Sequence, residues 1–235
     1  MLSLLFGQGQ RPDFGALDTL SRDGGGSLHF SISHQPDPDE GWLELLASGL
    51  TFDCRGLAPA PPQPVPPPGA LLGLAEAPVG EAVSLSPGPH LLEGGGLLPV
   101  VRILVGLGAA IASLPGLRAV VWHPARSWMV PDYFRSIAGT WLGGGAFPAL
   151  GLTTLERHGA SGMTSFGLAL FTGQELRLEG MVGLAPGAMA RIAMRLVHEL
   201  VLEGPLLEPR DYVGPGGELL HAAPDGRFVS VRLDG

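Results

Sequence analysis

The sequence predicts an α+β protein with mixed sheets and with helices packed on one face of them. Stretches in which apolar and polar residues alternate predict strands, and they are interleaved with stretches whose apolar residues recur at helical spacing. Several expected strands follow each other through glycine-containing turns, which favours hairpins over purely parallel pairing. A proline-rich run separates the elements into two groups, so we expect two α/β subunits joined by a connector and packed into one body.

The first group, residues 1–58, is expected to form a small strand–helix–strand–strand unit. Its strands are expected over residues 2–6, 27–34 and 49–57, and its helix within residues 11–26. Asp13 is a suitable N-cap for this helix. The apolar face of the helix is made by Phe14, Leu17 and Leu20.

Residues 59–78 form the proline-rich connector of this prediction. The stretch "APAPPQPVPPPG", residues 58–69, has seven prolines in twelve residues, a composition that favours polyproline II and excludes the interior of a sheet. We interpret it as a stiff spacer between the two subunits. The alternative is that the run is a ligand for a proline-binding domain.

The second group, residues 79–235, is expected to form a larger α+β unit. Its strands are expected over residues 81–88, 117–123, 174–180 and 226–235, with a hairpin over 146–171 that turns at His158 and Gly159. Its helices are expected over residues 98–114, 131–142 and 186–204. Two of these helices have clear apolar faces, formed by Phe134, Ile137, Ala138 and Trp141 in one and by Ile192, Leu196, Val197 and Leu200 in the other.

Composition indicates the kind of partner. Apolar residues make up 45% of the chain and charged residues 15%, which leaves part of the apolar surface for a partner protein or for a homodimer. The net charge of −8 and the lack of a basic cluster disfavour nucleic acid and anionic membranes. The most apolar stretch, residues 103–117, is too short to span a bilayer, and the N-terminus does not resemble a signal peptide, so we expect a cytoplasmic protein.

The sequence predicts neither a cofactor nor a metal ion. Gly106-x-Gly108 lacks the third small residue of a dinucleotide-binding fingerprint, because Ile111 stands there, and we interpret the glycines as small residues that allow close helix packing. The seven histidines show no metal-binding spacing. Cys54, the single cysteine, is interpreted as a small apolar side chain in a strand; the alternative is a reactive thiolate beside Arg55.

A strand, a glycine turn and a short glutamate-bearing strand follow one another in "GLTTLERHGASGMTSFGLALFTGQELRLEG", and "DYVGPGGE" adds a late glycine turn. The positions that carry this pattern are Ser165, Gly167, Leu168, Phe171, Gly173, Glu175 and Leu176. Together with "LTFDCRGLAPAPPQPVPP", a strand that runs into prolines, they make the chain similar to the bacterial family known as domain of unknown function 4261. The resemblance implies a fold and brings no established activity, and His123 in "WHPARSW" has no counterpart in the family pattern.

The segment "AVVWHPARSWMVPDYF" contains the best candidate for acid–base chemistry, His123. Imidazole titrates near neutral pH, and the carboxyl end of a buried strand is a common place for bound ligands. Glu175 or Glu179 would orient the imidazole. The alternative, which we favour, is a structural corner in which Trp122 and Trp128 pack and His123 donates to a nearby carbonyl.

Aromatic residues and one arginine mark the candidate binding surface. Those of the corner are Trp122, Arg126 and Trp128, and those of the turn "SFGLALFTGQEL" are Phe166 and Phe171. Arg126 would hold an anion. The turn is dense in apolar residues, so it forms either an exposed interaction lip or, as we favour, the packing centre of its unit.

We therefore expect a non-catalytic protein-binding module, an accessory or immunity-like protein that recognises its partner through an acidic and apolar surface. The sequence contains no complete catalytic set in support of an enzyme. The alternative is a small hydrolase-like enzyme that uses His123 with Glu175 or Glu179. That alternative requires the side chains to converge within about 3 Å of one another in one pocket.

Overall fold

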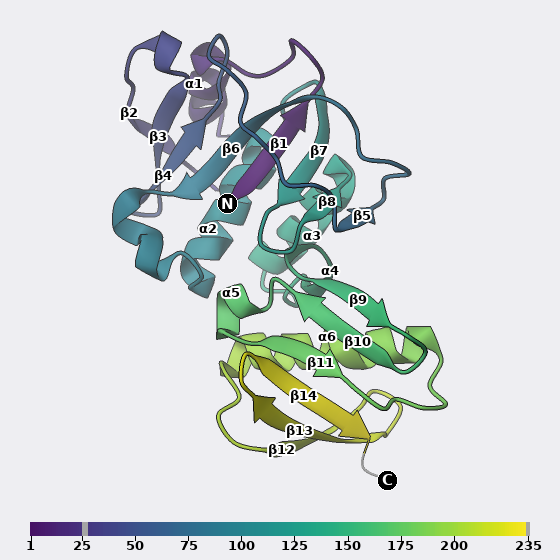
Figure 1. The fold of residues 1–235 in the computed structure, drawn as a ribbon. Coiled ribbons are helices and arrows are strands. Elements are labelled where there is room, and N and C mark those ends of the chain that lie inside the picture. Colours follow the sequence, from purple (N-terminus) through teal and green to yellow (C-terminus); the bar gives the residue numbers. More distant parts are fainter. Residues whose placement is uncertain (25–27, 234–235) are drawn as a thin grey trace. The chain divides into compact units, whose positions relative to one another are not determined.

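The computed structural model describes residues 1–24 and 28–233, and the chain divides into two compact units, Met1–Gly145 and Ala146–Gly235. Within the described residues, each unit has one sheet, of eight strands in the first and of six in the second (Figure 1). Each sheet contains both antiparallel and parallel pairs. This confirms the predicted α+β class with mixed sheets.

The sheet of the first unit has the strand order β2-β3-β4-β6-β1-β7-β8-β5. Its strands are β1 (Leu2–Phe6), β2 (Ser31–His34), β3 (Trp42–Ala47), β4 (Leu50–Arg55), β5 (Ala70–Leu72), β6 (Glu81–Pro87), β7 (Leu117–Trp122) and β8 (Ser127–Met129). Neighbouring strands are antiparallel from β2 to β8, and β5 joins the edge in parallel with β8. The apolar strand predicted over residues 2–6 lies inside the sheet, between β6 and β7.

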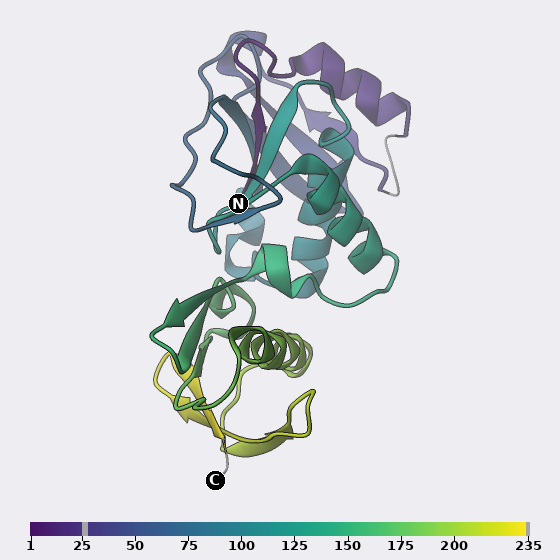
Figure 2. The ribbon, with the colours of Figure 1, turned by 90° about the vertical axis from the view of Figure 1, so that its right-hand side faces the viewer.

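Helices cover one face of this sheet, as predicted (Figure 2). They are α1 (Phe14–Arg22), α2 (Leu98–Ile111) and α3 (Pro131–Leu142); two 3-10 turns, η1 (Pro38–Glu40) and η2 (Pro89–Gly94), lie in the connections. The side chain of Asp13 accepts a hydrogen bond from the backbone N–H of Ala16, which satisfies a donor at the start of α1. Phe14, Leu17 and Leu20 are buried, so the predicted cap and apolar face of this helix are confirmed.

Two glycines allow α2 to lie close to its neighbours. A Cβ atom at Gly108 would stand 2.8 Å from Cδ2 of Leu2, and a Cβ at Gly106 would stand 2.8 Å from Cδ2 of Leu28. Carbon atoms without a bond between them do not approach so closely. The interpretation of Gly106-x-Gly108 as a packing feature is therefore confirmed.

Residues 59–78, which we call the proline cover, lie on the face of the first sheet that the helices leave open (Figure 2). A cluster of buried residues occupies this face, formed by Leu5, Ala82, Ala119, Val121 and Trp128. The cover packs Val65, Leu71, Leu74 and Ala77 against that cluster. Apolar surface on both faces of a sheet must be buried, and here an extended segment covers the second face, while its short strand β5 joins the edge of the sheet beside β8.

The division of the chain therefore differs from the predicted one. The proline-rich run does not connect the two units, because β4, β6 and β1 on either side of it pair within one sheet. The first unit extends to Gly145, beyond the predicted boundary at residue 58. The run was expected to be a spacer because prolines cannot donate the backbone hydrogen bonds of a sheet interior. A segment that packs across the face of a sheet does not need those hydrogen bonds, so the prolines are compatible with this position.

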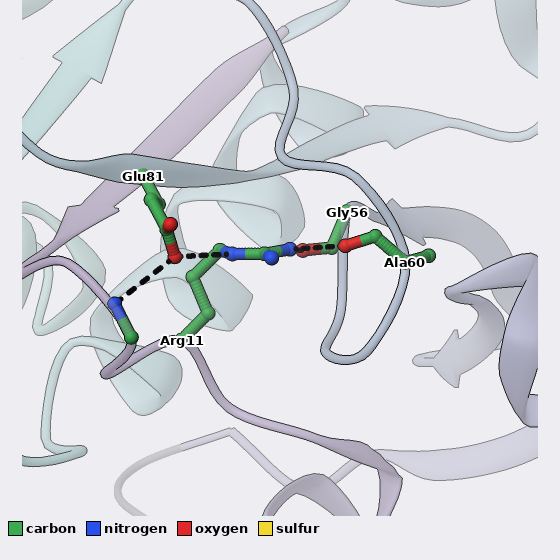
Figure 3. Close-up of polar contacts among 5 residues, drawn as sticks. Arg11, Gly56, Ala60 and Glu81 are labelled. Carbon is green, nitrogen blue, oxygen red and sulfur yellow. Dashed lines mark hydrogen bonds and ion pairs between the residues drawn. The ribbon is translucent and has the colours of Figure 1, made fainter.

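An arginine fastens the start of the proline cover to the sheet (Figure 3). Nε of Arg11 donates to the Glu81 carboxylate at 2.9 Å, and its Nη1 donates to the carbonyls of Gly56 and Ala60 at 2.5 and 2.8 Å. The hydrogen bond from Arg11, followed by one from the backbone N–H of Gly9, lowers the pKa of Glu81. The Arg11 side chain is 9% exposed and that of Glu81 is 25% exposed, so the guanidinium is mostly removed from water while the carboxylate stays partly solvated.

The sheet of the second unit has the order β12-β13-β14-β11-β10-β9, with β11 and β14 parallel. Its strands are β9 (Thr154–His158), β10 (Gly162–Phe166), β11 (Glu175–Leu178), β12 (Arg210–Val213), β13 (Leu219–Asp225) and β14 (Phe228–Leu233). Its helices are α4 (Ala149–Leu152), α5 (Ala169–Thr172) and α6 (Pro186–Glu203). The long helix α6 packs on β10 and β11 and buries its apolar face as predicted, including Ile192, Leu196, Val197 and Leu200.

Several strands depart from the predictions. β2 begins at Ser31 instead of residue 27, and residue 27 lies outside the described residues, as do residues 234 and 235 at the end of the last predicted strand. The predicted hairpin over 146–171 has its strands at β9 and β10, with the short helices α4 and α5 on either side. β3, β5, β8, β12 and β13 were not predicted. β12 was missed because it is a mostly exposed edge strand without alternating apolar residues. β13 was missed because it includes Pro224, a residue typical of turns.

Candidate functional site

The candidate site is a hollow of about 820 Å³ on the second unit, over the face of the sheet opposite α6. Its walls come from β9, β10, β11 and the start of β14, and they include His158, Thr164, Phe166, Glu175, Arg177 and Phe228. Sites for small ligands and peptide side chains have volumes of this order. Aromatic rings and charged groups line the same space, which suits a ligand with both apolar and polar parts.

The alternation of β11 explains why these groups lie together. Leu176 and Leu178 are buried, whereas Glu175 and Arg177 are only half-buried. Successive side chains of a strand point to opposite faces, so the leucines take the α6 side and the charged residues take the side of the hollow. The wet face predicted for residues 174–180 is confirmed, and it forms the floor of the site.

Arg177 is stacked on an aromatic ring in this hollow. Its guanidinium carbon lies 3.5 Å from the centroid of the Phe228 ring, and the guanidinium carbon of Arg227 lies 5.0 Å from the same centroid. The nearest carboxylate oxygens, from Glu179 and Asp225, are 3.8 Å from Nη1 of Arg177. This distance is too long for a hydrogen bond, so the ring holds the guanidinium while its N–H donors remain available to a ligand.

Glu175 has a structural role at the edge of the hollow. Oε1 accepts hydrogen bonds from the backbone N–H groups of Gly167 and Ala169 at 2.8 and 3.2 Å. Oε2 accepts from the hydroxyl of Ser165 at 2.5 Å and from the N–H of Leu168 at 3.3 Å. The carboxylate thus fixes the turn before α5, and this accounts for the serine, glycine and glutamate spacing in "SFGLALFTGQEL".

His123 lies at the end of β7 in the first unit, where its Nε2 is 2.8 Å from the hydroxyl oxygen of Ser3. Burial, and secondarily the positive charge of the N-terminal amine, lowers the pKa of His123 to about 4. Glu175 and Glu179 belong to the second unit, and Glu179 accepts a hydrogen bond from Arg232 there at 3.1 Å. The polar contacts of the predicted catalytic set are therefore made separately within the two units, and the hydrolase-like alternative gains no support from them.

The two tryptophans beside His123 are part of the core of the first unit. Trp122 is 1% exposed and Trp128 is 5% exposed, and Nε1 of Trp128 donates to the carbonyl of Pro66 in the proline cover. The structural corner is therefore the better interpretation of this segment, and these rings are not a binding surface. The backbone N–H of His123 donates to the carbonyl of Met1 at 3.2 Å, whereas its imidazole contacts the hydroxyl of Ser3.

The remaining predicted binding residues differ in exposure. Arg126 is exposed on the turn between β7 and β8, and its carbonyl accepts a hydrogen bond from the backbone N–H of Gly69. Phe166 is half-buried and lines the hollow. Phe171 packs edge-on against Phe147, with ring centroids 5.1 Å apart, and supports the interpretation of its turn as a packing centre.

Neither Cys54 nor a cluster of metal-ligating side chains forms a site among the described residues. Cys54 is fully buried in β4, and burial together with the charge of Asp53 raises its pKa to about 12, so the side chain is a neutral thiol, as the apolar interpretation requires. Within residues 1–24 and 28–233, no group of three or more histidine, cysteine, aspartate and glutamate side chains is arranged to hold a metal ion.

Comparison of the chain with protein-family models, with curated proteins and with solved structures gives no match. None of the helices formed by the described residues has the length and apolar content needed to cross a bilayer. Sequence reasoning missed Arg177 and Phe228 as site residues. Their signals were an arginine alternating with leucines in "ELRL" and an aromatic residue directly after a glycine turn.

Proposed function

We propose that the protein is a non-catalytic protein-binding module and that the hollow of the second unit binds a carboxylate on its partner. The observation that carries the proposal is Arg177, held on the Phe228 ring with its ion-pair partners at 3.8 Å. A guanidinium offers two parallel N–H donors that match a carboxylate. An aspartate or glutamate side chain, or the carboxylate at a chain end, supplies that group.

The position of the hollow favours an extended protein segment as the ligand. β9 is the edge strand of the sheet and contributes His158 to the wall. An edge strand presents backbone N–H and C=O groups to which another chain adds as a strand. A segment that pairs with this edge would place alternate side chains over the hollow, where Phe166 and Phe228 provide apolar contacts.

Selection from a displayed library of random peptides with free C-termini tests this function on the intact chain. We expect enriched peptides to share a carboxylate, and Arg177→Gln to weaken their binding about tenfold, which corresponds to the loss of one charged hydrogen-bonded contact. Phe228→Leu should also weaken the binding of these peptides, because the Phe228 ring positions the guanidinium of Arg177. Arg191→Gln is the matched control, since Arg191 is exposed on α6 and does not line the hollow.

Two outcomes count against the function. One is that no peptide is enriched above the level of an inert protein. The other is that the same peptides bind Arg177→Gln and the unaltered chain equally well. Sedimentation of the chain alone checks the homodimer alternative, because a dimer formed through this face would dissociate in Arg177→Gln and not in Arg191→Gln.

A further inference from the structure

The outer surface of the proline cover carries prolines in a three-residue repeat. Pro61, Pro64 and Pro67 are all exposed. A polyproline II helix has three residues per turn, so residues three apart lie along the same edge of the helix. In that conformation these three exposed prolines form one continuous edge that faces solvent.

The composition of the run specifies this backbone. Each proline fixes its own φ near the polyproline II value, and a residue that precedes a proline is driven towards the same region. In "APPQPVPPP", residues 60–68, every residue is a proline or directly precedes one. Residues 61–68 contain no turn or bend: the preceding turn lies at Ala58 and Pro59, and the nearest positive φ values lie outside the run, at Gly56 (85°) and Gly73 (76°).

The opposite edge of the helix is held by the sheet. The backbone N–H of Gln63 donates to the carbonyl of Ala82 at 2.9 Å, and the carbonyl of Pro66 accepts from Nε1 of Trp128 at 3.2 Å. Gln63 and Pro66 are three residues apart, so both contacts lie on one edge. Val65 adds a packed side chain between them. The sheet therefore contacts the run through Gln63, Val65 and Pro66, and the edge with Pro61, Pro64 and Pro67 remains exposed to solvent.

We propose that residues 61–67 are a preformed polyproline II ligand for a partner domain whose groove is lined by aromatic side chains. Proline rings pack on aromatic faces, and the spacing Pro61-x-x-Pro64-x-x-Pro67 matches a groove that accepts one ring per turn. A strand-forming partner does not fit, because prolines donate no backbone hydrogen bond to a sheet. Because the sheet has already ordered the segment, docking costs little further conformational entropy.

Arg126 gives the ligand a direction. A Cβ atom at Gly69 would lie only 3.2 Å from Cβ of Arg126, so the arginine leaves the surface where a side chain at position 69 would leave it. Arg126 is exposed. Its cation therefore stands two residues beyond Pro67, and the matching groove carries an acidic residue at that end.

Purified SH3, WW and EVH1 domains are suitable probes, because all three classes bind polyproline II through aromatic grooves. A synthetic peptide of residues 58–69 first selects the domains that recognise the run itself. We then expect those domains to bind the folded chain at least as tightly as the peptide, since the chain presents the same edge already ordered. Pro64→Ala combined with Pro67→Ala should weaken binding about tenfold or more, and Arg126→Gln should weaken it less.

Pro115→Ala is the matched control, since Pro115 is exposed in the same unit but outside the cover. Tryptophan fluorescence verifies folding, because Trp128 lies directly beneath the cover. Binding to the peptide but about tenfold weaker binding to the chain would mean that the edge is occluded, and this would overturn the proposal. So would an absence of peptide-binding domains from the panel, or equal binding by the proline variants and the Pro115→Ala control.

Discussion

Glu175 offers a direct test of how the turn before α5 is held. Its carboxylate accepts three backbone N–H groups and the Ser165 hydroxyl. A hydrogen bond to a charged group contributes about 1.5–3 kcal/mol, and a buried donor left without a partner costs about 1–3 kcal/mol. Leu168 and Ser165 are fully buried, whereas Ala169 is exposed and regains water. For Glu175→Ala we therefore expect the free energy of unfolding of the second unit to fall by about 3–4 kcal/mol.

Hydrogen exchange followed by mass spectrometry measures this loss unit by unit. Trp42, Trp122, Trp128 and Trp141 all lie in the first unit, so tryptophan fluorescence reports on that unit, while peptides from β10, β11 and α6 report on the second. Glu175→Gln keeps an acceptor oxygen and should lose about half as much stability. Glu208→Ala, at an exposed site, is the control. A change in Glu175→Ala of less than about 0.5 kcal/mol, the range of ordinary surface substitutions, would refute this account.

Three further predictions concern the first unit. Gly108→Val should lower its free energy of unfolding by about 2–3 kcal/mol, because the added atoms collide with Leu2; urea unfolding followed by fluorescence measures this, and an unchanged midpoint would contradict it. Arg11→Ala should cost about 2–3 kcal/mol and speed hydrogen exchange over residues 56–62, because it leaves the buried carbonyls of Gly56 and Ala60 without their donor; unaltered exchange there would argue against this role of Arg11. The pKa of His123 is about 4 in the fold, so the imidazole stays neutral there while the unfolded chain takes up a proton. Its contribution to the free energy of unfolding is therefore fully present above about pH 6.5 and is lost as the pH falls towards 4. Because the ring is partly exposed, the loss is about 1–2 kcal/mol, and a pH series of urea midpoints should lose that slope in His123→Gln; identical slopes would exclude His123 as its source.

The sequence by itself determined the elements whose signals are local. Asp13 and the spacing of Phe14, Leu17 and Leu20 predict α1, and the alternation around Arg177 predicts β11 with one wet face. Such patterns arise within one or two turns or a few strand residues, so no distant contact is needed to interpret them. The same reasoning predicted the α+β class, the apolar face of α6 and the packing role of the glycines in α2.

Tertiary structure decided where those elements go and which residues face solvent. The proline run favours polyproline II from its composition alone, but its place over the sheet depends on an apolar face assembled from Leu5, Ala82, Ala119 and Val121, which lie in three strands far apart in the chain. The hollow likewise needs Phe228 beside Glu175, and this register exists only because β14 pairs in parallel with β11. Alternation predicts which side of a strand is wet, but not which strand is its neighbour. Strand pairing places the Phe228 ring under Arg177, and it also assembles the apolar sheet face beneath the proline cover. Both depend on strands that are distant in the chain, so no local pattern in the sequence predicts them.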